Sequence, residues 1–395
     1  MKKILALIII LFGMSPVFAS QNLSFVYING SNNNDEKMKT WYEEGVRKLH
    51  PTLRKKFLRN SGVKKYYSDK GGLEIKKEPV IFFWGDKSKT DLDFVRNQLD
   101  ISKAISSSGA YLVRSLIAQY MHDAIWVQKS HNMMPILADL NKYVINEAND
   151  GQDVILYGYS AGTFVAYEYM FNKLRYINAN ELFKTINKDK EFLDFIEKNP
   201  RKNTCLSALG YDYAKIGALS TSGHIILNND KEQIRESYLR LDEITELACA
   251  PEKNFRGIVN FASPLVLFYS DLADESYQVN YFNKLMTKHI FENGIFWVNV
   301  NFKEDPLGFP TSRNFTVAEL EKRMNIDIVN PSGVIYDNSS VWSKRMFPFA
   351  HTAYWSARGT FSRAVVKSFV NGYKFQYDLK YQTKVLKKRN PKSEL

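Results

Sequence analysis

The chain is poor in the residues that build metal and redox centres. Its 395 residues include two cysteines and six histidines. The histidines show no H-x-x-x-H or similar spacing, and no carboxylate cluster offers oxygen ligands for a hard cation. No glycine-rich loop with the lysine of a phosphate-binding loop follows a candidate strand. The sequence therefore predicts no metal site and no cofactor.

The apolar run at the N-terminus is too short to span a bilayer. It extends from Ile4 to Phe12, after two lysines, and is followed by Val17-Phe18-Ala19. A basic start, a short apolar run and small residues are typical of a secretory signal peptide, cleaved here after Ala19. A retained anchor is the alternative. We expect a secreted or periplasmic protein.

Composition indicates a folded, basic protein. Hydrophobic residues make up 45% of the chain and aromatic residues 14%, enough for a sizeable core. The formal net charge is +12, but apart from the tail Lys384 to Lys392 and the stretch Lys184 to Lys202 the lysines are scattered. The charge therefore predicts a solvated surface without specific nucleic-acid binding, and it favours peripheral contact with anionic membranes. The sequence does not indicate an oligomeric state.

Apolar strands alternate with helical patterns, which predicts an α/β fold with a mostly parallel central sheet flanked by helices. The segment from Pro51 to Lys77 is polar and poorly periodic, so we expect a connection there rather than core. The expected strands are Ser24 to Ile28, Val80 to Trp84, Asp153 to Tyr157, Gly257 to Phe261, Ile295 to Asn301 and Gly333 to Tyr336. The expected helices are Glu36 to Leu49, two between Ser102 and Ala148, Ala161 to Asn172, and Leu265 to Leu272.

The alternation stops between Tyr176 and Asn254. This segment has lysine-rich helical stretches and no pattern of a central strand, so it is interpreted as an inserted helical cap or lid within a core of residues 20–175 and 255–395. Both cysteines, Cys205 and Cys249, lie in it. In an oxidising compartment such a pair favours a disulfide, with two buried free thiols as the alternative.

The motif that points to chemistry is Gly158-Tyr159-Ser160-Ala161-Gly162. It lies between a buried strand and a helix, where a serine on a sharp turn can raise its hydroxyl above the sheet edge. The small flanking residues let the strand and the helix approach each other. This context predicts that Ser160 is a nucleophile, and a plain glycine-rich turn is the alternative.

The serine turn, an earlier strand that ends at Asn29-Gly30, a later acid and a late histidine together resemble the α/β-hydrolase superfamily, in particular its lipases and esterases. The resemblance covers most of the chain outside the expected cap. It implies an α/β-hydrolase fold and a triad in the chain order Ser, acid, His. Three histidines precede Ser160, His224 lies in the cap and His289 lies before a strand, so His351 is the expected general base.

The resemblance places the acid in the loop after the penultimate strand. Asp305 lies there, in an Asp-Pro turn, and is the expected acid. Asp337, at the end of the last strand, and Glu304 are the alternatives.

The oxyanion of the reaction needs preorganised donors. The resemblance implies the backbone N–H of Ala161 and a second donor around Gly30 and Ser31. Many relatives carry His-Gly where this chain has Asn29-Gly30, and this departure leaves the second donor open.

We therefore expect a serine hydrolase that cleaves carboxylic esters, preferably lipid or acyl esters, through an acyl-enzyme. A serine peptidase or thioesterase with the same triad is one alternative. The other alternative is a secreted or cell-envelope binding protein that has the fold but not the enzymatic activity.

Overall fold

The computed structural model describes residues 21–31, 36–68, 71–103, 107–172, 254–269, 290–292, 294–310, 321, 325, 327–328, 332–345 and 350–389. The expected signal peptide and both cysteines lie outside the described residues. The expected cap also lies outside them, except for Asn254.

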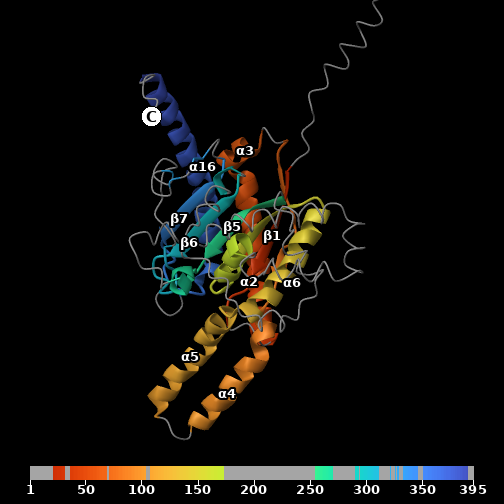
Figure 1. The fold of residues 1–395 in the computed structure, drawn as a ribbon, viewed down its shortest axis with the longest axis vertical. Helices are drawn as coiled ribbons and strands as arrows, with labels where there is room; N and C mark the ends of the chain where they lie inside the picture. The colour runs from red at the N-terminus through yellow and green to blue at the C-terminus, as the bar shows by residue number, and fades with distance from the viewer. Residues whose placement is uncertain are drawn as a thin grey trace, which may run out of the picture.

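A seven-stranded sheet forms the centre of the molecule (Figure 1). Its order is β2-β1-β4-β5-β6-β7, with β3 beside β1, and all of its pairs are parallel. This confirms the predicted α/β class with a parallel central sheet flanked by helices. The strands are β1 (Gln21–Ile28), β2 (Leu73–Ile75), β3 (Val80–Phe82), β4 (Asp153–Tyr159), β5 (Phe255–Phe261), β6 (Phe296–Phe302) and β7 (Val334–Val341).

Helices cover both faces of the sheet. Strands β4 and β6 are buried at every position, which explains why they read as continuous apolar runs rather than as alternating patterns. The helices are α2 (Glu36–Arg59), α3 (Ser61–Ser68), α4 (Lys89–Lys103), α5 (Ser108–Val127), α6 (Ser130–Asn149), α7 (Gly162–Tyr167) and α16 (Arg358–Arg389). Among the described helices, none has the length and hydropathy of a membrane span.

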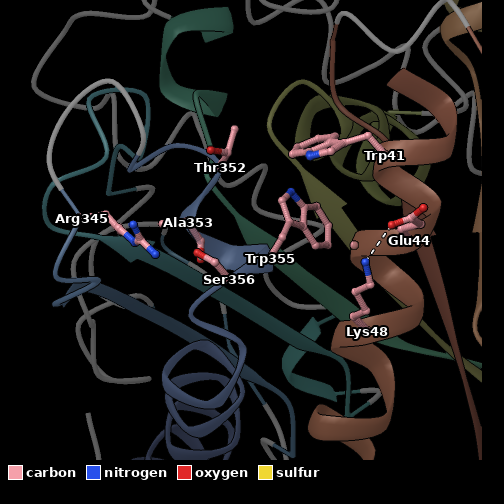
Figure 2. Close-up of a pocket in the computed structure, with 9 residues that line it drawn as sticks. Trp41, Glu44, Lys48, Arg345, Thr352, Ala353, Trp355 and Ser356 are labelled. Carbon is pink, nitrogen blue, oxygen red and sulfur yellow. Dashed lines mark hydrogen bonds and ion pairs between the residues drawn. The ribbon is translucent and has the colours of Figure 1, made fainter. Parts of the chain in front are cut away.

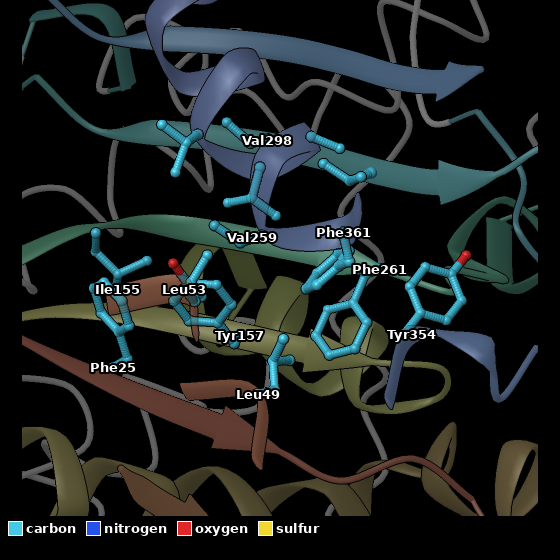
Figure 3. Packing of buried hydrophobic residues seen from close by; sticks show 14 of the residues in the cluster. Phe25, Leu49, Leu53, Ile155, Tyr157, Val259, Phe261, Val298, Tyr354 and Phe361 are labelled. Carbon is cyan, nitrogen blue, oxygen red and sulfur yellow. The ribbon is translucent and has the colours of Figure 1, made fainter. Parts of the chain in front are cut away.

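One core lies between the sheet and helices α6 and α7, and the other lies between the sheet and helices α2, α3 and α16. The second core is rich in aromatic rings (Figure 3). Phe25 packs on Tyr157 at 4.9 Å between centroids, and Phe261 packs on Tyr354 at 5.6 Å. This aromatic layer reaches the carboxyl ends of the strands, where it fixes the segment that contains Tyr354.

The prediction that helix α2 ends near Leu49 was wrong. The helix continues through Pro51 to Arg59 because Leu53 and Phe57 extend its buried face. Proline removes one backbone hydrogen bond, but burial of two large apolar side chains offsets that cost. The interpretation of residues 51–77 as a connection outside the core was also wrong, since Val63 and Tyr67 of α3 are buried.

Other boundaries differ less. The helix expected from Ala161 to Asn172 is divided into α7 and a π-helical turn at Glu168–Asn172, and Leu265–Tyr269 is a short 3₁₀ helix. Strand β7 continues to Val341 instead of ending at Tyr336. Helices α4 and α16 were not anticipated. Figure 1 shows α4 and α5 as a pair that extends away from the sheet.

His50 of α2 is a buried histidine with two polar contacts. Its Nε2 lies 3.0 Å from the carbonyl oxygen of Lys76, and its Nδ1 lies 3.0 Å from the hydroxyl of Tyr27. A carbonyl oxygen can only accept, so Nε2 carries the proton and Nδ1 accepts from Tyr27. This arrangement requires neutral imidazole, and burial lowers the pKa of His50 below its ordinary value.

We predict an acid-dependent loss of stability from His50. Below about pH 6.5 the unfolded histidine takes up a proton while the folded one resists it, so the free energy of unfolding falls until the lowered pKa is reached. His50→Gln should lower the Tm at pH 7.5 and should show a smaller further drop between pH 7.5 and 5.8 than the parent protein. Thermal unfolding at both pH values measures this, with His122→Gln as the control. If the Tm of His50→Gln and that of the parent protein fell equally between pH 7.5 and 5.8, the assignment of His50 as a buried neutral histidine would be contradicted.

Candidate active site

Ser160 lies on the tight turn between β4 and α7. Its φ is +52°, a left-handed conformation that a serine adopts only when its surroundings enforce it. A side chain at Gly162 would collide with the carbonyl oxygens of Ile28 and Asn29, and a Cβ at Gly158 would lie 2.8 Å from the Cα of Thr163. The two glycines of the motif are therefore required by the packing of the turn.

A buried polar network holds the turn from below. Thr163 donates from its Oγ1 to the carbonyl oxygen of Ser160 at 2.7 Å, and Ser263 donates from its Oγ to Thr163 at 3.2 Å. The backbone N–H of Ser263 in turn donates to Asn301 Oδ1 at 3.0 Å. No sequence motif indicates these three residues. The network ties the ends of β4, β5 and β6 together under the serine.

The structure brings Ser160, His351 and Asp305 into one row of hydrogen bonds. His351 Nε2 lies 2.9 Å from Ser160 Oγ, and His351 Nδ1 lies 2.9 Å and 3.2 Å from the two oxygens of Asp305. An ionised carboxylate only accepts, so Nδ1 donates to Asp305 and Nε2 is left to accept from the serine hydroxyl. Ser160 and Asp305 are each 5% exposed. His351 can therefore remove the hydroxyl proton of Ser160 with little competition from water.

Tyr354 also belongs to this site, although no sequence motif assigns it a role. It donates from its hydroxyl to Asp305 Oδ2 at 2.9 Å, and the same hydroxyl accepts from the N–H of Phe302 at 2.9 Å. The ring stacks on that of Phe302 at 4.1 Å. Burial, together with the nearby Asp305 charge, raises the pKa of Tyr354 well above its ordinary value, so it stays a neutral donor. Its place three residues after His351 was the available signal.

The two alternative acids bind elsewhere. Asp337 accepts from Asn299 Nδ2 at 2.8 Å and from the hydroxyl of Ser339 at 2.7 Å. Glu304 accepts from the N–H and the hydroxyl of Ser343, both at 3.0 Å. Burial would raise the pKa of Glu304, but the hydrogen bonds to its carboxylate outweigh this and lower it. Of the three candidate carboxylates, only Asp305 has a hydrogen bond to His351 among the described residues.

Two backbone segments meet beside Ser160. Among the described groups, none accepts a hydrogen bond from the N–H of Ala161. Gly30 lies so close to the serine that a Cβ there would be 2.8 Å from Ser160 Cβ. The half-buried Ser31 follows Gly30 at the end of the described loop. The two predicted donor segments therefore flank the serine.

Asn29 stabilises this loop through hydrogen bonds. Its Oδ1 accepts from the N–H of Trp84 at 2.9 Å, and its own carbonyl oxygen accepts from the Trp84 indole at 2.7 Å. Its amide also donates to the carbonyl oxygen of Gly30 at 2.8 Å. Asn29 therefore fastens the Gly30 segment to the end of β3.

Comparison of the chain with protein-family models, curated proteins and solved structures gave no match. Within the described part of the chain, no group of three or more His, Cys, Asp or Glu side chains could hold a metal ion. The row Ser160, His351 and Asp305 is the arrangement there with the parts for nucleophilic catalysis.

Proposed function

We propose that the chain is a serine hydrolase with an α/β-hydrolase fold that cleaves carboxylic esters. The observation that carries the proposal is the row of hydrogen bonds from Ser160 through His351 to Asp305. The strained turn and the parallel sheet that presents it support the same assignment. Catalytic triads are recognised by this geometry and by the role of each member.

The first half of the reaction follows from the contacts. His351 Nε2 takes the hydroxyl proton as Ser160 Oγ attacks the carbonyl carbon of the ester. The carbonyl oxygen then carries the negative charge of a tetrahedral intermediate, and the N–H of Ala161 with the Gly30 and Ser31 segment would stabilise it. The ester C–O bond breaks as His351 returns the proton to the leaving alkoxide. Asp305 accepts the hydrogen bond of His351 Nδ1 and stabilises the imidazolium.

In the second half, water takes the place of the alcohol. His351 removes a proton from this water, the resulting hydroxide attacks the acyl carbon, and Ser160 Oγ leaves and regains its proton from His351. The products are a carboxylic acid and the free enzyme. Burial of Ser160 keeps the hydrogen bonds of the triad strong throughout.

The substrate class we propose is lipid or acyl esters, encountered by a secreted or periplasmic protein. A basic protein surface would favour substrates at an anionic membrane. A peptide or a thioester could be cleaved by the same three residues, so these remain the second candidate activities. The residues 176–254 are proposed as the cap that would select among them.

Labelling with a fluorophosphonate tests the proposal directly. Attack by Ser160 Oγ on phosphorus expels fluoride and leaves a stable phosphonyl-serine, so the protein should gain the mass of one probe less HF at Ser160. A series of p-nitrophenyl esters of increasing chain length then separates a lipase from a short-chain esterase. A folded protein that takes up no probe would point instead to a binding protein with this fold.

Tyr354→Phe tests whether the tyrosine positions Asp305. Loss of the hydroxyl removes one donor from the carboxylate, and the less stabilised charge of Asp305 pairs more strongly with His351. We expect kcat/KM to fall about tenfold, because Asp305 loses one of the hydrogen bonds that hold it in place. The acid limb of the pH profile should move to higher pH, because His351 becomes more basic. The control is Tyr157→Phe, since the buried hydroxyl of Tyr157 has no hydrogen bond among the described residues. An unmoved pH profile in Tyr354→Phe would argue for a purely structural role.

A further inference from the structure

A groove of about 390 Å³ lies between helix α2 and the segment that follows His351 (Figure 2). One wall is helix α2, with Trp41, Glu44 and Lys48, the other is the segment after His351, with Thr352, and Trp355 forms the floor between them. Arg345, after β7, also lines it. Thr352 directly follows the proposed base, so the groove lies beside the catalytic row and is not part of it.

The floor of the groove is tightly packed. The indole of Trp355 packs so tightly on α2 that a Cβ at Gly45 would lie 2.9 Å from it, and Trp355 is 8% exposed. Trp355 also packs on the ring of Tyr159, 5.0 Å away between centroids, and the Tyr159 hydroxyl donates to the carbonyl oxygen of His351 at 3.0 Å. The floor is thus connected to both the nucleophile turn and the base loop.

The upper wall of the groove presents an indole to solvent. Trp41 is 37% exposed and meets Trp355 edge to face at 6.1 Å. Figure 2 shows the nitrogen edge of Trp355 directed toward Trp41. An exposed indole in a concave surface suits the apolar chain or ring of a ligand.

The charges of the described lining residues favour an anion. Lys48 is paired with Glu44 at 2.7 Å, whereas the exposed Arg345 has no carboxylate partner among the described residues. Figure 2 shows Arg345 and Lys48 on either side of Trp355. An arginine fork binds a carboxylate or phosphate through two parallel hydrogen bonds.

The turn that contains Arg345 is held by the acid loop. Glu304, next to Asp305, accepts hydrogen bonds from the N–H and hydroxyl of Ser343. The Ser343 hydroxyl also accepts from the N–H of Arg345 at 3.0 Å. The backbone of Arg345 is therefore fixed relative to the catalytic carboxylate.

We propose that this groove binds an acidic group on the acyl chain of the ester substrate. Arg345 forms an ion pair with the acidic group, and Trp41 packs on the adjacent apolar part of the chain. The inference rests on the proposed function and narrows its substrates to esters that carry a carboxylate or a phosphate. Both anions present a pair of oxygens that can accept two parallel hydrogen bonds from a guanidinium.

Matched substrates test the inference. p-Nitrophenyl hemiadipate and p-nitrophenyl hexanoate have acyl chains of equal length, but only the first ends in a carboxylate. The hemisebacate and decanoate esters repeat the comparison for a longer chain. We expect kcat/KM to favour the charged member of at least one pair by about tenfold. A monoalkyl phosphate added as a competing ligand shows whether phosphate shares the site.

Arg345→Gln should abolish this preference for the charged ester. The control is Lys344→Gln, which removes an equal charge from an adjacent exposed residue outside the groove and should keep the preference. Equal kcat/KM for charged and uncharged esters at both lengths would overturn the inference while the proposed function stands. If no ester is cleaved, calorimetric titration of the protein with the hemiadipate ester decides: binding weakened about tenfold by Arg345→Gln supports the groove, and no binding overturns it.

Discussion

Ser160→Ala is expected to reduce ester turnover on the order of 10⁵-fold and to eliminate fluorophosphonate labelling. Without Oγ no acyl-enzyme can form, and only water activated by His351 remains as a nucleophile. The residual rate should come from the donors around Ala161 and from substrate binding. The measurement is kcat for p-nitrophenyl butyrate, with the mass of the labelled protein as a second result.

Ser263→Ala is the matched control for this variant. It removes an equally buried hydroxyl from the network below the turn, but that hydroxyl bonds to Thr163 and not to the reacting atoms. Its kcat should stay within about tenfold of the parent value, and circular dichroism should show both variants folded. Parent-like turnover in folded Ser160→Ala would exclude Ser160 as the nucleophile.

Asp305→Asn is expected to lower kcat by about 10³- to 10⁴-fold. Three donors point at this carboxylate: His351 Nδ1–H, the Tyr354 hydroxyl and the N–H of Leu307. An amide replaces one oxygen by a donor, so at least one of these contacts becomes unfavourable, and the charge that stabilises the imidazolium is lost. Little of the effect should appear in KM, because Asp305 acts on the base and not on the bound ester.

Asp337→Asn and Glu304→Gln are the controls for the acid. Both remove a carboxylate near the same sheet edge, but neither carboxylate has a hydrogen bond to His351 among the described residues. We expect both to retain kcat within about tenfold for p-nitrophenyl butyrate. A variant at Asp337 that loses activity while Asp305→Asn keeps it would assign the acid to β7.

The parts of the fold that the sequence predicted are local ones. A buried parallel strand such as β4 reads as an apolar run, and the turn after it requires Gly158 and Gly162 at fixed offsets from Ser160. His351 and Asp305 were expected from the chain order that the resemblance to α/β-hydrolases implies, and the structure places His351 beside Ser160 and Asp305 beside His351.

The features that were missed depend on contacts between distant residues. Pro51 reads as a helix end, and only the core that receives Leu53 and Phe57 shows why the helix continues. Tyr354 is 49 residues from the carboxylate that it contacts, and no periodicity connects such a pair. Arg345 likewise gains its place in the groove through Glu304 and Ser343, not through a motif.

The short segment from His351 to Trp355 combines the proposed base, the donor to its acid and the floor of the adjoining groove. An insertion or deletion of one residue there would displace all three at once. New substrate preferences in descendants of this protein should therefore arise by substitution of residues on the solvent-exposed side of α2, such as Trp41. The length of the segment from His351 to Trp355 should stay constant.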